Sequence, residues 1–267
     1  MGRLGACHCG QNGSMPSPIL SISDADIAGI ERATLDAVAP PVVEEFDNWL
    51  LPFDTSTIGR AKSAVPLRHH LLDADQIAAI ERIYAARGLQ AAFRVADVAG
   101  LSNMHTELLR MGYSAQQPTL VQLATVQRMR QICQDTPADV STTPTSAWSA
   151  VYLGNGFDPV DGAHRIQALS RSRYVVYASV QDAGQPVAAG TASLSQGWVS
   201  IHGMRTAALC RGRGLAARVL AGLADVAAER GLERVFLQVE EGNHSALALY
   251  SRAGFSTAWR YHYWRKP

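Results

Sequence analysis

The order of apolar segments in the second half of the chain limits the fold most strongly. Three strand-like segments, residues 174–181, 187–194 and 198–206, follow one another with only short turns between them, which predicts an antiparallel meander. A long amphipathic helix, residues 212–230, comes next, with Gly231 behind it as a stop. Because strand–helix–strand units then follow the meander, we expect a mixed sheet with helices on both faces.

The two halves of the chain share an order of elements. After the long helix we expect a strand at 234–240, a helix at 245–253 and a strand at 255–264, and before the meander short helices at 146–153 and 162–170. The first half predicts helices at 22–38, 74–87 and 103–111, and strands at 47–53, 61–67, 91–95 and 119–125. AARGLQAAFRVA weakly echoes AAERGLERVFLQVE, which suggests a tandem repeat. We expect a disordered leader (1–20), a first domain (21–130), a linker (131–145) and a second domain (146–267).

Composition excludes several classes of protein. The chain has 267 residues, 47% of them hydrophobic, which is enough for one large core or two small ones. No apolar run approaches the ~18–20 residues of a membrane span, so we expect no membrane association. A formal charge of +1 gives no field that attracts nucleic acid. Without the apolar segment of a signal peptide, the expected location is cytoplasmic.

The cysteines indicate neither a disulfide framework nor a metal site. There are four, widely scattered: Cys7, Cys9, Cys133 and Cys210. Cys7 and Cys9 flank His8, but structural zinc needs four ligands and the chain has no second pair at a suitable spacing. We therefore expect no metal.

A loop rich in glycine and arginine opens the long helix. It consists of Arg211, Gly212, Arg213, Gly214, Leu215 and Ala216. Free N–H groups and the helix dipole favour negative charge at a helix start, and glycines let a phosphate approach the backbone. The two arginines can add charge-assisted bonds. The Lys-Ser/Thr pair of a P-loop and the third glycine of a dinucleotide fingerprint are absent. Taken alone, the loop is equally compatible with a plain helix start.

A second motif, NHSALALYSRAGF at residues 243–255, follows after one helix and one strand. With the loop, it resembles the GNAT (GCN5-related) N-acetyltransferases, whose signature is Gln/Arg-x-x-Gly-x-Gly/Ala followed by Asn-x-x-Ala-x-x-x-Tyr-x-x-x-Gly-Phe. The matching residues are Arg211, Gly214 and Ala216, then Asn243, Ala246, Tyr250, Gly254 and Phe255. The resemblance covers residues 146–267. Residues 22–125 look like a degenerate half of the same fold, with no glycine loop between Leu67 and Ala74.

The resemblance implies a fold, a cofactor and a set of site residues. The fold would be α/β of the mixed α+β kind, a mostly antiparallel twisted sheet flanked by helices in two tandem halves. Acetyl-CoA would be the acyl donor. Met204, Arg205 and Thr206 would end the central strand that pairs with the pantetheine arm and polarises the thioester carbonyl. Residues 211–216 would hold the pyrophosphate and Asn243 would bond the cofactor. Tyr250, a phenol protonated at neutral pH, would protonate the leaving thiolate.

The base that takes the proton of the attacking amine has two candidate side chains, His202 and Glu240, besides water. Many relatives use a glutamate on the central strand, but residues 198–206 contain no carboxylate. They contain His202, at a position where some arylalkylamine-type relatives carry a catalytic histidine. Strand alternation predicts that Ser200, His202 and Met204 share a face, and an ordinary histidine pKa near 6.5 suits a base. A structural His202, with Glu240 or water as the base, is the alternative. Cys210 reads as an apolar filler rather than an acyl carrier.

These observations favour an N-acetyltransferase that moves acetyl from acetyl-CoA to a primary amine by direct attack in a ternary complex. The alternative is a domain that binds acyl-CoA without turnover, as a sensor or scaffold. The acceptor stays open between a small-molecule amine and a peptide amine. We expect no nucleic-acid partner, and a homodimer is an open alternative.

Overall fold

The computed structural model describes residues 22–267, so the expected leader and the Cys7-His8-Cys9 pattern lie outside the described residues. The first half contains α1 (Asp24–Val38), β1 (Val42–Phe46), β2 (Trp49–Phe53), β3 (Val65–Pro66), α2 (Asp75–Ala85), β4 (Phe93–Ala96), α3 (Ser102–Arg110), β5 (Ser114–Thr125) and α4 (Val126–Arg130). The second half contains β6 (Asp139–Ser141), α5 (Ser146–Tyr152), α6 (Pro159–Arg171), β7 (Val175–Asp182), β8 (Gln185–Ser195), β9 (Trp198–Thr206), α7 (Leu215–Glu229), β10 (Arg234–Glu240), α8 (His244–Arg252) and β11 (Ser256–Arg265). Three short 3₁₀ turns are η1 (Gly59–Ala61), η2 (Ala99–Leu101) and η3 (Ala208–Cys210).

Eight of the strands form one sheet in the order β4-β11-β5-β10-β9-β8-β7-β6, and β1, β2 and β3 form a smaller antiparallel sheet. In the larger sheet only β9 and β10 pair in parallel, and its other neighbouring strands pair antiparallel. The expected mixed, mostly antiparallel sheet with flanking helices is confirmed. A single parallel bridge between Ala64 and Phe93 brings the end of the smaller sheet to β4.

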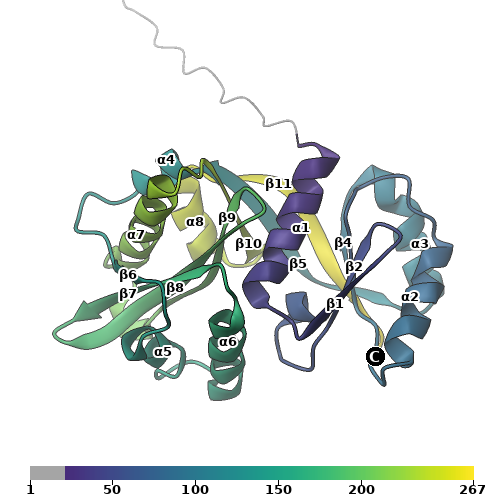
Figure 1. Cartoon of the computed structure of the whole chain (residues 1–267), viewed down its shortest axis with the longest axis horizontal. Helices are drawn as coiled ribbons and strands as arrows, with labels where there is room; N and C mark the ends of the chain where they lie inside the picture. Colours follow the sequence, from purple (N-terminus) through teal and green to yellow (C-terminus); the bar gives the residue numbers. More distant parts are fainter. Residues whose placement is uncertain (1–21) are drawn as a thin grey trace, which may run out of the picture.

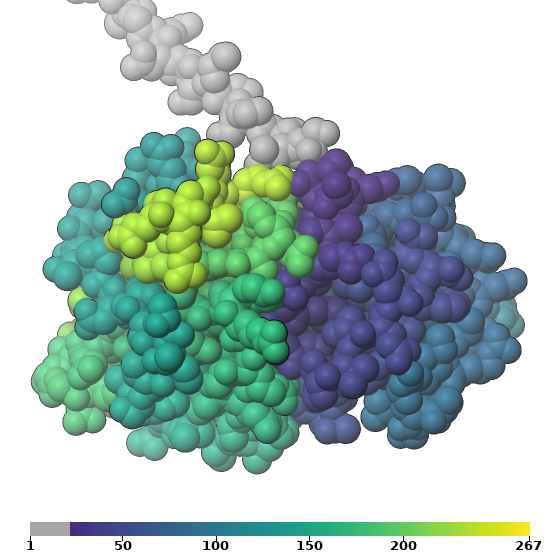
Figure 2. Space-filling model, in the orientation of Figure 1, coloured from purple at the N-terminus to yellow at the C-terminus, as the bar shows by residue number. Residues whose placement is uncertain are grey.

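The two halves exchange their last strands. β5, from the first half, lies between β10 and β11 of the second half, and β11 lies between β5 and β4. Figure 1 shows both strands running from one lobe into the other. Each half therefore completes its sheet with a strand of the other, and the two lobes pack directly against each other (Figure 2).

The helices cover both faces of the sheet in the second half. α7 packs on one face of β6–β9, while α1, from the first half of the sequence, packs on the opposite face of β8 and β9 (Figure 1). Gly29 of α1 permits this approach, because a Cβ there would lie 3.2 Å from Nε1 of Trp198. The first half thus supplies one wall of the second half.

Some elements differ from the expectation. β1 and α4 were not expected, and part of the expected linker at 131–145 forms the edge strand β6, which pairs with β7. β1 has four exposed residues and no apolar alternation, so only its pairing with β2 marks it as a strand. The division into two domains stays a prediction.

Candidate active site

β9 and β10 pair over only three residues and then part. Ser200 pairs with Phe236 and Ile201 with Leu237, and no further pair follows although both strands continue. The backbone of β9 after Ile201 is therefore open on its β10 side. A parting of two parallel strands leaves unpaired amide groups that an extended ligand can bond.

A β-bulge lies at the same point in β9. His202 pairs with Thr191 and Arg205 with Ala189, so Gly203 and Met204 together oppose one residue, Gly190. Gly203 has φ +62°, a left-handed conformation that glycine adopts readily. The bulge reverses the alternation of side chains. The expectation that Met204 shares a face with Ser200 and His202 is therefore wrong.

Met204 instead points to the α7 face, where Gly190 leaves room for it. A Cβ on Gly190 would lie 2.4 Å from Sδ of Met204 and 2.9 Å from Val219 of α7. Arg205, rather than Met204, shares a face of the sheet with His202. Thr206, paired with Ala188, ends the strand.

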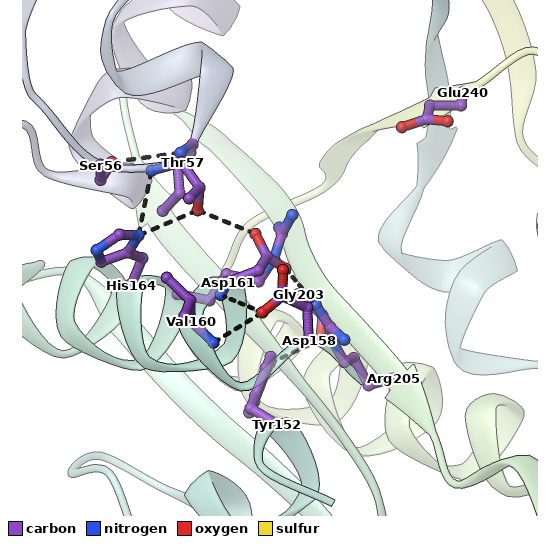
Figure 3. Close-up of polar contacts among 12 residues, drawn as sticks. Ser56, Thr57, Tyr152, Asp158, Val160, Asp161, His164, Gly203, Arg205 and Glu240 are labelled. Carbon is purple, nitrogen blue, oxygen red and sulfur yellow. Dashed lines mark hydrogen bonds and ion pairs between the residues drawn. The ribbon is translucent and has the colours of Figure 1, made fainter. Parts of the chain in front are cut away.

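Side chains of α5 and α6 hold the bulge (Figure 3). The Tyr152 hydroxyl donates to the Gly203 carbonyl at 2.6 Å, and Arg205 donates to Asp161 at 2.7 Å. Asp161 also accepts from Arg165 (2.7 Å) and from Thr57 of the first half (3.1 Å). Tyr152 and Asp161 are not predicted from the sequence, since no local pattern connects them to Gly203 and Arg205, which lie 51 and 44 residues further along the chain.

The loop ahead of α7 has the features of an anion site. Gly212 and Gly214 both have φ +76°, and a Cβ on either would meet nothing within 4 Å. In α7, the first backbone N–H groups that donate to a backbone carbonyl are those of Ala217 and Arg218, and both donate to the Gly214 carbonyl. The N–H groups of residues 212–216, which include Leu215 and Ala216, have no carbonyl partner among the described residues. They are free for a phosphate.

The polar side chains around this loop are partly engaged. Arg213 pairs with Asp182 at 2.7 Å on the surface, and Arg211 makes only a long bond of 3.5 Å to the Thr206 carbonyl. The Asn243 side chain caps α8, accepting from the Ala246 N–H at 3.2 Å. Its amide nitrogen donates to no described group, so capping leaves it available to a ligand.

Tyr250 lies on α8 in the same hydrophobic cluster as Leu237 and Val239 of β10. Its side chain packs against Phe255, with ring centroids 5.8 Å apart. Burial raises the pKa of Tyr250 to about 12. The phenol therefore stays protonated across the neutral range, and its hydroxyl bonds to no other described side chain.

The two candidate bases lie in different surroundings. His202 is the first residue of β9 beyond the last pair with β10; it is buried, and neither ring nitrogen has a hydrogen-bond partner among the described residues. Burial, followed by the charges of Arg60 and Arg165, lowers the pKa of His202 well below 6.5. Glu240 is exposed and accepts from Gln117 at 2.7 Å. It lies apart from the bulge (Figure 3).

The first half has no equivalent of the phosphate loop. In the repeated order of elements, α2 stands where α7 stands in the second half, but it begins with Asp75, whose N–H donates to Asp73 at 3.0 Å. Two carboxylates at a helix start repel a phosphate. Residues 22–267 also contain no cluster of three or more His, Cys, Asp or Glu side chains that could hold a metal ion.

Comparison with known proteins decides the family. Residues 24–264 match the family described as probable histone acetyltransferase Rv0428c, C-terminal. The chain belongs to this family, within the GNAT N-acetyltransferases. A part of this GNAT chain is also 37% identical over 76 residues to the uncharacterized N-acetyltransferase YobR of Bacillus subtilis, a match that covers 28% of the chain and 31% of YobR.

Solved GNAT structures share the fold over nearly the whole chain. A GCN5-related N-acetyltransferase from Kribbella flavida aligns over 90% of this chain and 95% of its own, with a TM-score of 0.67 and 14% identity. A tandem GNAT protein from the clavulanic acid biosynthesis pathway aligns over 92% and 96%, with a TM-score of 0.58 and 15% identity. The tandem arrangement expected from the sequence therefore has a structural counterpart. No described helix of this GNAT chain has the length and apolar character needed to cross a membrane.

Proposed function

We propose that the chain transfers acetyl from acetyl-CoA to a primary amine at the parting of β9 and β10. The observation that carries this proposal is the placement of that parting beside a loop of free N–H groups and next to the helix that bears Tyr250. Pantetheine would bond the open edge of β9 and the loop would hold the pyrophosphate.

The chemistry would proceed by direct attack of the amine on the thioester. The open β9 amides after Ile201 would stabilise the oxygen of the tetrahedral intermediate. The attacking nitrogen becomes positively charged as its bond to carbon forms, and neutral His202 would accept its proton. The thiolate of CoA would then leave as Tyr250 donates a hydrogen bond and its proton to the sulfur.

The direct test is release of the CoA thiol from acetyl-CoA with a panel of amines, with the acetylated amine identified by mass spectrometry. We expect thiol release that depends on the amine. Binding of acetyl-CoA without such release would favour the sensor or scaffold instead.

We expect one acetyl-CoA site per chain, in the second half. A Gly214→Glu variant should bind acetyl-CoA at least ~10-fold more weakly, because the new carboxylate repels the phosphates and closes the loop. Gly88→Glu is a matched control, since Gly88 also has a positive φ (+67°) with nothing within 4 Å of its Cβ position, but it lies far from the loop, just after α2. Calorimetry that finds two sites, or equal weakening in both variants, would contradict this prediction.

A pH profile tests His202. Because the pKa of His202 is lowered well below 6.5, the imidazole is mainly neutral at pH 6.5 and can accept a proton. We therefore expect kcat, measured with saturating amine, to decrease with acidity only at pH values well below 6.5, in an acid limb that reports His202. His202→Gln should remove that limb and lower kcat by about 10²-fold. If the variant keeps the wild-type kcat, the base is Glu240 or water.

A further inference from the structure

Arg60, a residue of the first half, reaches the parting of β9 and β10 in the second half. It lies in η1, a turn pressed against β11: a Cβ on the preceding Gly59 would lie 2.9 Å from the Tyr263 ring. The Ser63 hydroxyl donates to the Gly59 carbonyl at 2.7 Å and holds the turn closed. The backbone of Arg60 is thus fixed by contacts from both halves.

The guanidinium group of Arg60 meets β10 where the strands separate. Ser200 and Phe236 are paired, so the next residues on that face of the two strands are His202 and Gln238, the first beyond the last pair. Arg60 donates to the Gln238 side-chain oxygen at 3.4 Å. The Gln238 side chain is held in place by Thr34 (2.9 Å) and by the Tyr261 hydroxyl (3.0 Å).

Arg60 has donors to spare at this point. Its bond to Gln238 is long, its Nε is buried with no partner, and no carboxylate of residues 22–267 forms an ion pair with it. Both ring nitrogens of His202 are likewise buried and unpartnered. Buried polar atoms in native proteins are nearly always bonded to protein or to water, so three buried nitrogens without a protein partner beside one parting indicate a further group that would bond them.

The charge around the parting indicates the class of that ligand. The positive charges of Arg60 and Arg165 both disfavour protonation of His202 and lower its pKa, and Arg165 already pairs with Asp161 at 2.7 Å. Arg205 shares Asp161 with Arg165, and Glu31, whose charge interacts with that of Arg60, is paired with Arg94. None of these carboxylates forms an ion pair with Arg60. An arginine fork matches a carboxylate in geometry as well as in charge.

We propose that Arg60 binds a carboxylate carried by the amine acceptor, so that the acceptors are amino acids rather than the lysine side chains of basic peptides. The proposal rests on the acetyl transfer proposed above. An acceptor would enter with its carboxylate on the Arg60 guanidinium and its nitrogen toward His202 and the thioester. A basic peptide would bring further positive charge to a site that already has an unpaired arginine.

The test compares amino acids with their carboxamides, which differ from them chiefly in the charge of the carboxyl group. For the wild-type chain we expect kcat/KM to be about 10- to 100-fold higher for the acid than for the amide, the range of a charge-assisted bond. The amino group of an amino-acid amide has a lower pKa than that of the free amino acid, so a larger share of it is neutral at a given pH. Assays at pH 9.5 and above reduce this difference between the two acceptors. A lysine-containing peptide with blocked ends should be a poorer acceptor than the amino acid.

Variants of Arg60 locate the effect. Arg60→Gln should lower kcat/KM for the acid about 10-fold or more, mainly through KM, and change kcat/KM for the amide much less. Arg60→Lys, which keeps the charge but loses the fork, should lower kcat/KM for the acid by an intermediate factor. Arg173→Gln, at an exposed arginine in the α6–β7 loop, is the control and should change neither. Thermal unfolding checks that each variant is folded.

The outcomes separate this proposal from the proposed function. Three results would overturn the role of Arg60 but leave acetyl transfer standing. They are an equal kcat/KM for acid and amide, a higher kcat/KM for the lysine peptide, or an equal loss of kcat/KM for both acceptors in Arg60→Gln. If no amine is acetylated, the proposed function fails. Calorimetric binding of amino acids to the CoA-saturated chain and to Arg60→Gln would then still decide whether Arg60 holds a carboxylate.

Discussion

A Tyr250→Phe variant is expected to release thiol at least ~10²-fold more slowly than the wild-type chain, the usual scale for loss of a general acid. Phenylalanine keeps the ring that packs against Phe255. The Tyr250 hydroxyl bonds to no other described group, so its removal should cost the fold little. The loss should therefore appear in the chemical step while the affinity for acetyl-CoA changes by less than about threefold.

Single-turnover thiol release and calorimetry measure these two quantities separately. Tyr84→Phe is the matched control: its hydroxyl donates to the Pro52 carbonyl at 2.8 Å within the first half. Removing that bond should lower stability by about 1 kcal/mol and leave the chemical step unchanged. If Tyr250→Phe reacts at the wild-type rate, Tyr250 is a packing residue and the leaving thiolate takes its proton elsewhere.

Replacement of Arg94 by leucine is expected to lower the free energy of unfolding by about 3–5 kcal/mol, because it leaves a buried carboxylate without its counterion. Arg94 of β4 and Glu31 of α1 are 1% and 3% exposed, and Nη1 lies 2.7 Å from Oε2. The ion pair joins α1, which packs on β9, to β4, which pairs with β11. Urea unfolding measures the loss.

Two further results would identify buried charge as the cause. The double variant Glu31→Leu with Arg94→Leu should recover most of the lost stability, since apolar replacement of a whole buried pair is often neutral. Burial already raises the pKa of Glu31, and the charge of Arg94 opposes this shift. Without Arg94 the pKa of Glu31 should rise further, so that its carboxyl becomes protonated and neutral at a higher pH. The defect of Arg94→Leu should therefore shrink as the pH falls toward 5. A loss below about 1 kcal/mol at neutral pH would contradict the prediction.

Most elements of the second half could be predicted from local sequence patterns. The predicted strands at 198–206 and 234–240 match β9 and β10, and the predicted long helix differs from α7 only at its ends. These elements follow from local signals: apolar periodicity, glycine stops, and a loop whose glycines allow positive φ. The family motif around Asn243 and Tyr250 lies within one helix and its cap, so it too could be found along the chain.

The assembly of the candidate site, in contrast, depends on long-range contacts that no local pattern reveals. Three features bring together residues that lie far apart in sequence: the exchange of β5 and β11, the bulge at Gly203, and the contact of Arg60 with Gln238. The direction of the Met204 side chain depends on the bulge, where β9 has one residue more than the part of β8 that it pairs with. Such a one-residue shift turns every later side chain of a strand to the other face of the sheet. Local propensity acts over a few neighbouring residues, whereas strand partners and buried charges are chosen by long-range contacts.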